Sequence, residues 1–247
     1  MRKQSENGLV WYESAALNEI GVRHGFFNRR GGSSKPPFDS LNVKTDLGDE
    51  EEKVLENRQL ILTSISAEKL VYSNGLPHKS DYLWVKSEQQ KDPAVDALAT
   101  GQHGLAIGLG VADCLPVIIS DGKIVAVIHA GWKGTLAGIV DKTVNDLVQN
   151  HEFNVEIAVA ALGPCICTTH LEVEGEAAKD FREHNGQEVN GSKFNVDLVK
   201  LNSLQLANNG VKNIDNLGIC AYESEEFFSY RRDHGNTGRN MAIALLS

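Results

Sequence analysis

The chain places a cysteine and a histidine at the ends of two neighbouring apolar segments. Cys114 stands before the apolar run 115–119, and His129 follows a second apolar run, 124–128. The Ser-Asp-Gly sequence at 120–122 is a tight-turn signal, so the two runs are expected to pair as antiparallel strands. Cys114 and His129 would then lie at the same end of the sheet. A thiol and an imidazole placed together can form part of a metal site or act as nucleophile and base.

The competing interpretation is a buried core cysteine beside a structural histidine, because free cysteine is commonly a core residue. The residues around the pair favour a functional role. Pro116 removes a backbone donor shortly after the thiol, and Gly131 and Gly134 allow the backbone to approach closely behind the imidazole.

Two arginines are candidates for binding an anion. The segment 49–66 is predicted to be a helix with acidic residues at its start, and Arg58 shares a face with Val54 and Ile61. An arginine on that inward stripe needs an anionic partner, either a carboxylate or a ligand. Arg29 begins a loop rich in glycine and basic residues, which suits an anion-binding loop and a solvated turn equally well.

Composition narrows the function classes. The chain has 247 residues, of which 41% are hydrophobic and 23% charged, as in an ordinary globular protein. Its net charge of −9 argues against general binding to nucleic acid or to a membrane surface, since both are polyanionic. The four cysteines do not form a disulfide scaffold in a chain of this length, and Cys165-Ile-Cys167 is too short for the usual zinc-knuckle spacing. No signal-peptide or membrane-length apolar run is visible, so we expect a cytoplasmic protein.

The elements that must position these residues alternate between strands and helices, without a linker or internal repeat. We therefore expect the α/β class and a single domain over residues 1–247. A helix predicted over 134–150 would begin beside His129, where its first amides could bind an anion. The other predicted helices cover 174–184 and 197–207, and the predicted strands include 22–30, 104–112, 155–162, 213–220 and 240–246.

Several motifs, in a fixed order along most of the chain, resemble one known family. They are His24-Gly25-Phe26, Arg29 with Gly31-Gly32, Ser40-Leu41-Asn42, Glu56-Asn57-Arg58, Asp96-Ala97-Leu98 with Thr100, Ala112-Asp113-Cys114-Leu115-Pro116, His129-Ala130-Gly131-Trp132-Lys133-Gly134, Gly163-Pro164-Cys165-Ile166, Phe227-Phe228-Ser229-Tyr230-Arg231-Arg232-Asp233 and Thr237-Gly238-Arg239. The chain resembles the YfiH/laccase-domain family of purine nucleoside phosphorylases, long labelled polyphenol oxidases. The resemblance implies a layered α/β/β/α sandwich with mixed sheets.

The resemblance also implies a metal site. The family's ligands carry over onto His78, Cys114 and His129, which would leave an open position on a catalytic zinc ion; copper is the second candidate metal. We assign His78, Cys114, His129 and Asp113 to catalysis, and Arg29, Asn42, Arg58 and Lys133 to binding of substrate and phosphate. The chain has Leu76-Pro77-His78-Lys79 where the family usually carries Gln-Val-His-Gly. We expect this departure to alter metal affinity or substrate choice.

The leading hypothesis is phosphorolysis of adenosine, inosine, guanosine or methylthioadenosine to the base and ribose 1-phosphate, with deamination of adenosine as a further activity. The expected partners are a small nucleoside and phosphate, with no nucleic acid or membrane, and the chain would be a monomer or homodimer. A metal-free hydrolase or amidase that uses Cys114 and His129 is the first alternative. A copper-dependent polyphenol oxidase fits poorly, because the eight histidines include no His-x-His pair. A non-enzymatic binding protein is supported only by the altered segment around His78.

Overall fold

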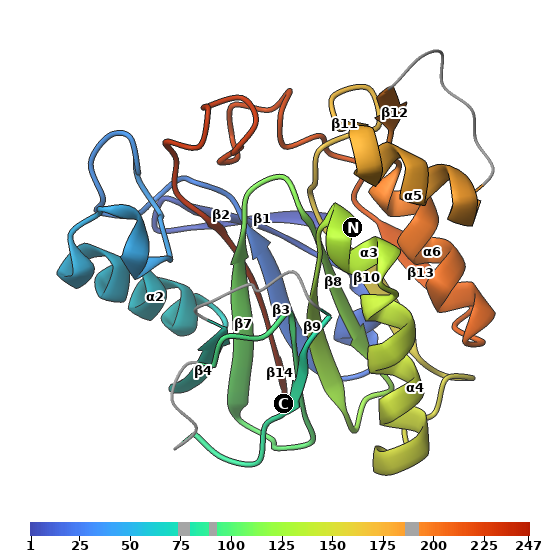
Figure 1. Cartoon of the computed structure of the whole chain (residues 1–247). Helices are drawn as coiled ribbons and strands as arrows, with labels where there is room; N and C mark the ends of the chain where they lie inside the picture. The colour runs from blue at the N-terminus through green and yellow to red at the C-terminus, as the bar shows by residue number, and fades with distance from the viewer. Residues whose placement is uncertain (74–79, 89–92, 186–192) are drawn as a thin grey trace.

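The protein is built from two facing β-sheets with helices on both outer sides (Figure 1). The structure is a computed structural model and describes residues 1–73, 80–88, 93–185 and 193–247. Apolar side chains from both sheets meet in a shared core between them, and two further cores lie between each sheet and its covering helices. This arrangement confirms the predicted α/β class and the layered α/β/β/α sandwich.

The first sheet has six strands in the order β1-β2-β3-β14-β7-β4. The last strand of the chain therefore lies inside the sheet, antiparallel to both of its neighbours. Helix α2 (Glu51–Ser64) packs on its outer face through Ile61 and Leu62. The strands are β1 (Arg2–Glu6), β2 (Leu9–Glu13), β3 (Val22–Phe27), β14 (Asn240–Leu246), β7 (Leu105–Val111) and β4 (Lys69–Ser73).

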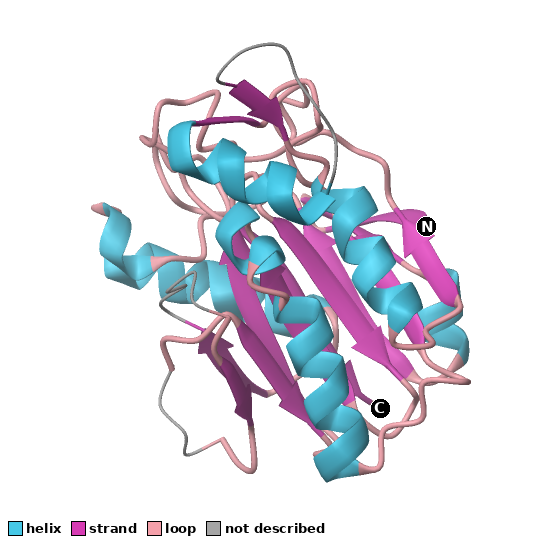
Figure 2. Ribbon diagram, turned by 45° about the vertical axis from the view of Figure 1, so that its right-hand side comes forward, coloured by secondary structure: helices cyan, strands magenta, loops and turns pink. Residues whose placement is uncertain are grey.

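The second sheet also has six strands, in the order β13-β10-β8-β9-β6-β5. Its outer face is covered by helices, seen in front of the strands in Figure 2. Every residue of β8 and β9 is buried, because one face meets the first sheet and the other meets the helices. Burial on both faces explains why these strands read as continuous apolar runs. The strands are β13 (Asn213–Asn216), β10 (Val159–Leu162), β8 (Leu115–Ser120), β9 (Val125–Ala130), β6 (Ala97–Thr100) and β5 (Tyr82–Trp84).

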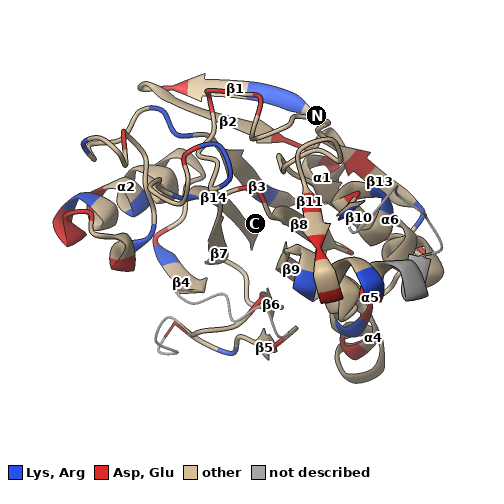
Figure 3. Cartoon of the chain, turned by 45° about the horizontal axis from the view of Figure 1, so that its top comes forward, with Lys and Arg blue, Asp and Glu red and all other residues tan. Residues whose placement is uncertain are grey.

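The remaining elements complete the layers. The helices on the second sheet are α3 (Trp132–Leu136), α4 (Ile139–His151), α5 (Gly175–Asn185) and α6 (Leu198–Asn208). Strands β11 (Glu172–Glu174) and β12 (Lys193–Asn195) form a small separate sheet. The chain also contains a short helix, α1 (Ala15–Glu19), and a 3-10 turn, η1 (Thr45–Leu47). In the view of Figure 3, acidic and basic residues are interspersed, with acidic residues at the start of α2 and along β11. Across the described ranges, no helix has both the length and the apolar character needed to cross a bilayer.

Local predictions are confirmed where the signals were strong. The hairpin of β8 and β9 forms as expected, and Asp121 Oδ1 closes its turn by accepting hydrogen bonds from the backbone of Lys123 and Ile124, both at 2.9 Å. Asp197 caps α6 by accepting from Lys200 N at 2.9 Å. The single helix predicted over 134–150 is wrong. Gly138 has a φ of 74°, a left-handed conformation that ends one helix before the next begins.

Candidate functional site

A cavity of about 410 Å³ lies at the end of the second sheet where β8 begins and β9 ends. Within the described residues, four separate parts of the chain form its wall, including the loop between β13 and β14, which crosses the top of Figure 1. The described residues that line it are Gly110, Val111, Ala112, Asp113, Cys114, His129, Gly131, Trp132, Ile166, Leu171, Tyr230, Arg231 and Arg239. The cavity thus contains a thiol, an imidazole, a carboxyl group, two guanidinium groups and two aromatic rings.

Cys114 and His129 meet in this cavity because of the strand register. Pro116 pairs with His129 across the hairpin, which places Cys114 directly beside the end of β9. His129 is only 2% exposed, and its Nδ1 lies 3.0 Å from Oδ1 of Asp96, a fully buried carboxyl group. The backbone N–H of His129 also donates to the carbonyl of Asp96 at 2.7 Å. The imidazole is therefore held in one orientation by the residue that precedes β6.

The electrostatic environment of His129 favours a positive charge. Burial by itself would lower the pKa of His129, but the charge of Cys114 and hydrogen bonds with Asp96 and Cys114 outweigh it and raise the pKa to about 9. Asp96 and Cys114 are the two groups responsible. The position is accordingly suited to a cation, whether that cation is a proton on the ring or a metal ion.

The same pair fits half of a zinc site. Because Asp96 engages Nδ1, the nitrogen of His129 that would coordinate a metal is Nε2, and a carboxylate behind a ligating histidine is the usual supporting arrangement. The thiol of Cys114 supplies a second donor of the type that zinc prefers. His78, the third predicted ligand, lies outside the described residues, so its part in the site stays a prediction.

Asp113 joins two parts of the cavity wall. Its Oδ2 accepts a hydrogen bond from the backbone N–H of Arg231 at 2.6 Å, and its carbonyl accepts one from Ile166 N at 2.9 Å. Its φ of 81° is a left-handed conformation that aspartate tolerates better than most residues. Burial raises the pKa of the Asp113 carboxyl, although nearby hydrogen bonds and arginines oppose this. Asp113 therefore shapes the cavity and also presents a carboxyl group to it.

The cations that line the cavity are not the ones we assigned to phosphate binding from the sequence. Arg239 is held by hydrogen bonds from Nη1 to the carbonyls of Thr237 and Gly238, both at 2.9 Å, and its guanidinium lies 5.6 Å from the Tyr230 ring. Arg231, eight residues earlier in the chain, also lines the cavity wall. Both arginines belong to motifs noted above only for the family resemblance. That was the signal that could have identified them.

Arg58 points inward, as its helical position predicts, but it does not line the cavity. Its Nε donates to the carbonyl of Val43 at 2.8 Å, and its guanidinium lies 3.7 Å over the ring of Tyr72. Tyr72 in turn lies behind Gly110, where an added Cβ would come within 2.4 Å of its hydroxyl. Arg58 is thus one layer behind the cavity wall, and direct contact between Arg58 and phosphate remains a prediction.

The other three predicted binding residues also lie away from the cavity wall. Arg29 lines a separate hollow of about 750 Å³ and forms an ion pair with Asp39 at 3.1 Å. Asn42 is fully buried, and its Oδ1 accepts a hydrogen bond from Arg239 N at 3.0 Å. Lys133 is exposed, and its Nζ lies 5.3 Å from the centre of the Trp132 ring. Of these, Asn42 has the clearest connection to the site, because it fixes the backbone of Arg239.

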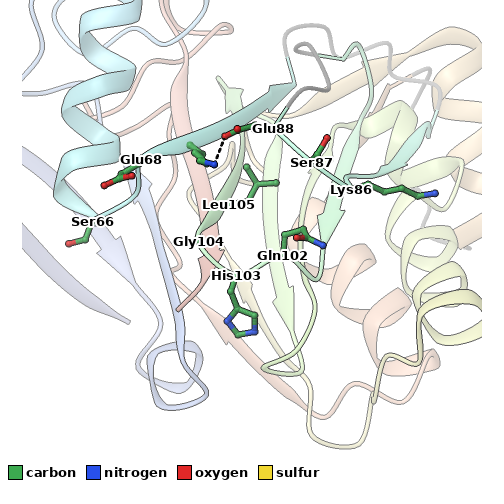
Figure 4. A pocket seen from close by; sticks show the side chains of 10 residues that line it. Ser66, Glu68, Lys86, Ser87, Glu88, Gln102, His103, Gly104 and Leu105 are labelled. Atoms are coloured by element: carbon green, nitrogen blue, oxygen red, sulfur yellow. Dashed lines mark ion pairs between the residues drawn. The ribbon is translucent and has the colours of Figure 1, made fainter.

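A further hollow of about 470 Å³ lies at the opposite end of β7, with the Lys69–Glu88 ion pair at 2.8 Å among its lining residues (Figure 4). Gly104 and Leu105 line this hollow at the start of β7, whereas Cys114 follows the end of the strand. At the rise of an extended chain, β7 itself spans roughly 20 Å. The described side chains that line it include no cysteine. We therefore place the chemistry at the Cys114 cavity.

The chain is similar in sequence to proteins named purine nucleoside phosphorylases. Purine nucleoside phosphorylase YfiH of Escherichia coli (strain K12) is 36% identical over 226 residues, covering 88% of this chain and 91% of that protein. A purine nucleoside phosphorylase of Bacteroides thetaiotaomicron is 33% identical, covering 96% of each chain.

Solved structures show the same architecture. The crystal structure of the hypothetical protein YfiH from Bacillus licheniformis superposes with a TM-score of 0.89 at 27% identity, covering 99% of both chains. The structure of YlmD from Geobacillus stearothermophilus gives a TM-score of 0.88 at 28% identity, covering 98% of this chain and 97% of that one. The family model described as multi-copper polyphenol oxidoreductase laccase matches residues 23–247. The chain therefore belongs to this laccase-like family, the one that includes the YfiH proteins.

Proposed function

We propose that this protein is a purine nucleoside phosphorylase whose active site is the Cys114 cavity. It would convert a purine nucleoside and inorganic phosphate to the free base and ribose 1-phosphate. The observation that carries the proposal is the grouping of the Cys114–His129 pair, supported by Asp96, with Arg231 and Arg239 in one cavity. The names of the relatives supply the reaction class.

The two arginines suit the phosphate. In phosphorolysis a phosphate oxygen bonds to C1′ of the ribose while the bond from C1′ to the base breaks and its electrons pass to the base. Arg231 and Arg239 would hold the phosphate dianion through charged hydrogen bonds, which are the strong ones for oxyanions. Asn42 would support this contact indirectly, because it anchors the backbone of Arg239.

The aromatic and acidic groups suit the base. Tyr230 is 55% exposed at the cavity, and Trp132 lies on the wall beside His129, so either ring could stack on a purine. The departing base carries developing negative charge and needs a proton or a donor. Burial raises the pKa of Asp113, which favours the protonated carboxyl that could supply that proton.

Cys114 and His129 would hold a zinc ion, with His78 as the proposed third ligand and copper as the second candidate metal. When bound, such an ion stabilises negative charge on an adjacent base or water molecule. That chemistry supports our further proposal that the protein deaminates adenosine. We also propose that it acts in the cytoplasm on small molecules rather than on nucleic acid or membranes, as a monomer or homodimer.

Phenol oxidation, which the family description suggests, is the second candidate. A multicopper centre requires several imidazoles close together. Within the ranges that the structure covers, the only group of three or more potential ligands close enough to share a metal ion contains a single histidine. The cavity residues therefore give more support to nucleoside chemistry than to copper oxidation. A metal-free hydrolase that uses Cys114 and His129 is the third candidate.

The test is a panel of purine nucleosides and a phenol, incubated with the purified full chain with and without phosphate. Release of base that requires phosphate and yields ribose 1-phosphate supports the proposal. Release without phosphate would indicate a hydrolase, and consumption of the phenol alone would indicate an oxidase.

Cys114→Ala separates the metal-dependent reaction from the hydrolase. We expect this variant to lose both cleavage activity and one equivalent of zinc. If Cys114 were instead a nucleophile in a metal-free hydrolase, the variant would lose cleavage activity without any change in metal content. Cys165→Ala is the matched control, because Cys165 is buried and does not line the cavity. Cleavage retained in Cys114→Ala would refute both readings of Cys114.

A further inference from the structure

We propose that Cys167, His170, Cys220 and Glu223 form a second metal site, a structural zinc site separate from the Cys114 cavity. Their potential ligand atoms are two Sγ atoms, Nδ1 of the histidine and a carboxylate oxygen, and all four lie within 4.8 Å of one another. None of the four residues lines the Cys114 cavity. Two thiolates with an imidazole and a carboxylate make a complete set of four zinc ligands.

The spacing of the donor atoms matches a tetrahedron around one zinc ion. With zinc–ligand bonds of about 2.0–2.3 Å, the donors of a tetrahedral site lie about 3.3–3.8 Å apart. Nδ1 of His170 lies 3.1 Å from Sγ of Cys167, 3.5 Å from Oε1 of Glu223 and 4.0 Å from Sγ of Cys220. Sγ of Cys167 lies 3.8 Å from Oε1 of Glu223. These four distances lie within about 0.2 Å of the tetrahedral range, and the two remaining pairs of donor atoms lie within 4.8 Å.

Two similar turns supply the ligands. Cys167 and His170 are three residues apart, and the backbone N–H of His170 donates to the carbonyl of Cys167 at 3.0 Å. Cys220 and Glu223 have the same spacing, and Ser224 N donates to the carbonyl of Cys220 at 3.0 Å. Two ligands separated by two residues in a tight turn are a common building unit of structural zinc sites. From the sequence we considered only Cys165 with Cys167, so neither unit was predicted.

The fold holds the two turns together without help from a metal. A parallel bridge joins Cys165 to Cys220, in which Ala221 N donates to the carbonyl of Cys165 at 2.9 Å. Cys167 N also donates to Sγ of Cys220 at 3.2 Å, a second contact between the two turns. The ring of His170 stacks on Tyr222 with centroids 4.2 Å apart, which fixes its orientation. These contacts position the ligand atoms in advance, as the supporting residues of a metal site do.

The site would brace one wall of the cavity. The guanidinium of Arg231 donates from Nη1 to the carbonyl of His170 at 3.2 Å and from Nη2 to that of Glu172 at 3.3 Å. Two residues of the cavity wall therefore adjoin this cluster. Ile166 directly precedes Cys167 in the chain, and Arg231 is hydrogen-bonded to the carbonyl of His170. A zinc ion bound here would therefore hold the loop that presents Arg231, although the metal site itself does not depend on the proposed activity.

The experiment uses the full chain carrying Cys114→Ala, so that the cavity no longer contributes its thiol. Zinc content is measured by native mass spectrometry, and the site is then loaded with Co²⁺ to reveal thiolate-to-metal charge-transfer absorption. We expect one zinc per chain and this absorption, both lost when Cys167→Ser and Cys220→Ser are added. Cys165→Ala is the matched cysteine control and should keep both signals.

A variant with less effect on folding is Glu223→Gln, because the Glu223 side chain is 60% exposed. It should keep the fold, measured by circular dichroism, and weaken zinc binding at least tenfold in a chelator competition. The proposal is overturned if the Cys114→Ala chain binds no zinc after reduction, if the serine variants keep it, or if Glu223→Gln leaves the affinity unchanged. A chain isolated with a Cys167–Cys220 disulfide that takes up no zinc on reduction also overturns it.

Discussion

Replacing Asp96 by asparagine is the most informative change at the site, because this carboxyl group uses both of its oxygens. Oδ1 lies 3.0 Å from Nδ1 of His129, and Oδ2 accepts a hydrogen bond from the backbone N–H of Ser80, also at 3.0 Å. Asparagine has nearly the same shape but offers only one acceptor oxygen. In Asp96→Asn the amide NH₂ must therefore face either the ring nitrogen or the backbone N–H.

The expected cost follows from this loss of one acceptor. A buried donor left without a partner destabilises a protein by about 1–3 kcal/mol. In a chain of this length each kcal/mol lowers Tm by about 2–4 °C, so Tm should fall by roughly 2–12 °C. Loss of the carboxylate behind a ligating histidine typically weakens metal binding by about 10–100-fold. We therefore expect Asp96→Asn to lower both stability and zinc affinity at the cavity.

Asp121→Asn is the matched control. Asp121 is 6% exposed at the turn of the same hairpin and accepts backbone hydrogen bonds from Lys123, Ile124 and Asn154, each at 2.9 Å. It should lower Tm by a similar amount without changing zinc affinity or base release. The assay combines thermal unfolding, zinc competition and base release on both variants. If Asp96→Asn changes Tm alone, as the control does, then Asp96 is only structural and our assignment of His129 as a supported ligand is wrong.

Three further predictions concern the cavity wall and the loop above it. Gly110→Ala should lower Tm and base release, because the added Cβ would clash with the Tyr72 hydroxyl and lie 2.9 Å from Cβ of Arg239. Gly101→Ala is the control: its added Cβ would meet no atom closer than 3.6 Å, so it should leave Tm and base release unchanged. Arg239→Gln should lower kcat/KM for phosphate by about 10–100-fold through the loss of charged hydrogen bonds, and a change under twofold in steady-state assays would remove it from the phosphate site. The pKa of Asp233 is lowered: burial would raise it, but hydrogen bonds from Arg232 and Thr237 outweigh burial. The Asp233 carboxylate therefore stabilises the fold above about pH 4, and this stabilisation is lost as the pH falls through the lowered pKa. Asp233→Asn should therefore be less stable than the parent at pH 7 and approach it in acid, as denaturant titrations at several pH values would show.

The features predicted correctly from the sequence are those that local signals determine. The hairpin that joins Cys114 to His129 depends on two apolar runs and a turn within sixteen residues, and the structure confirms it. The inward direction of Arg58 follows from helical periodicity, and Arg58 is 7% exposed. The helix break at Gly138 was missed because the apolar stripe continues across it, although the glycine itself was a visible signal.

The wall of the cavity was harder to predict because distant strands assemble it. Asn240, at the start of β14, pairs with Val111, at the end of β7, so that residues far apart in sequence become neighbours. This pairing brings Arg239 to the same end of the molecule as Cys114. No local pattern encodes the register between β14 and β7. Only the family motifs around Arg231 and Arg239 pointed to their importance.

The C-terminal loop also shows why residue type alone does not identify a binding cation. Of its three arginines, Arg232 is used inside the protein: its guanidinium donates to the carbonyls of Ala221, Ser224 and Phe227 and pairs with Asp233 at 2.8 Å. Arg232 therefore holds the loop in shape and does not line the cavity. Arg231 and Arg239, on either side of it in sequence, both reach the cavity wall. All three arginines donate to backbone carbonyls, so it is the folded position of each side chain, and not its residue type or its carbonyl bonds, that separates Arg232 from the two arginines on the cavity wall.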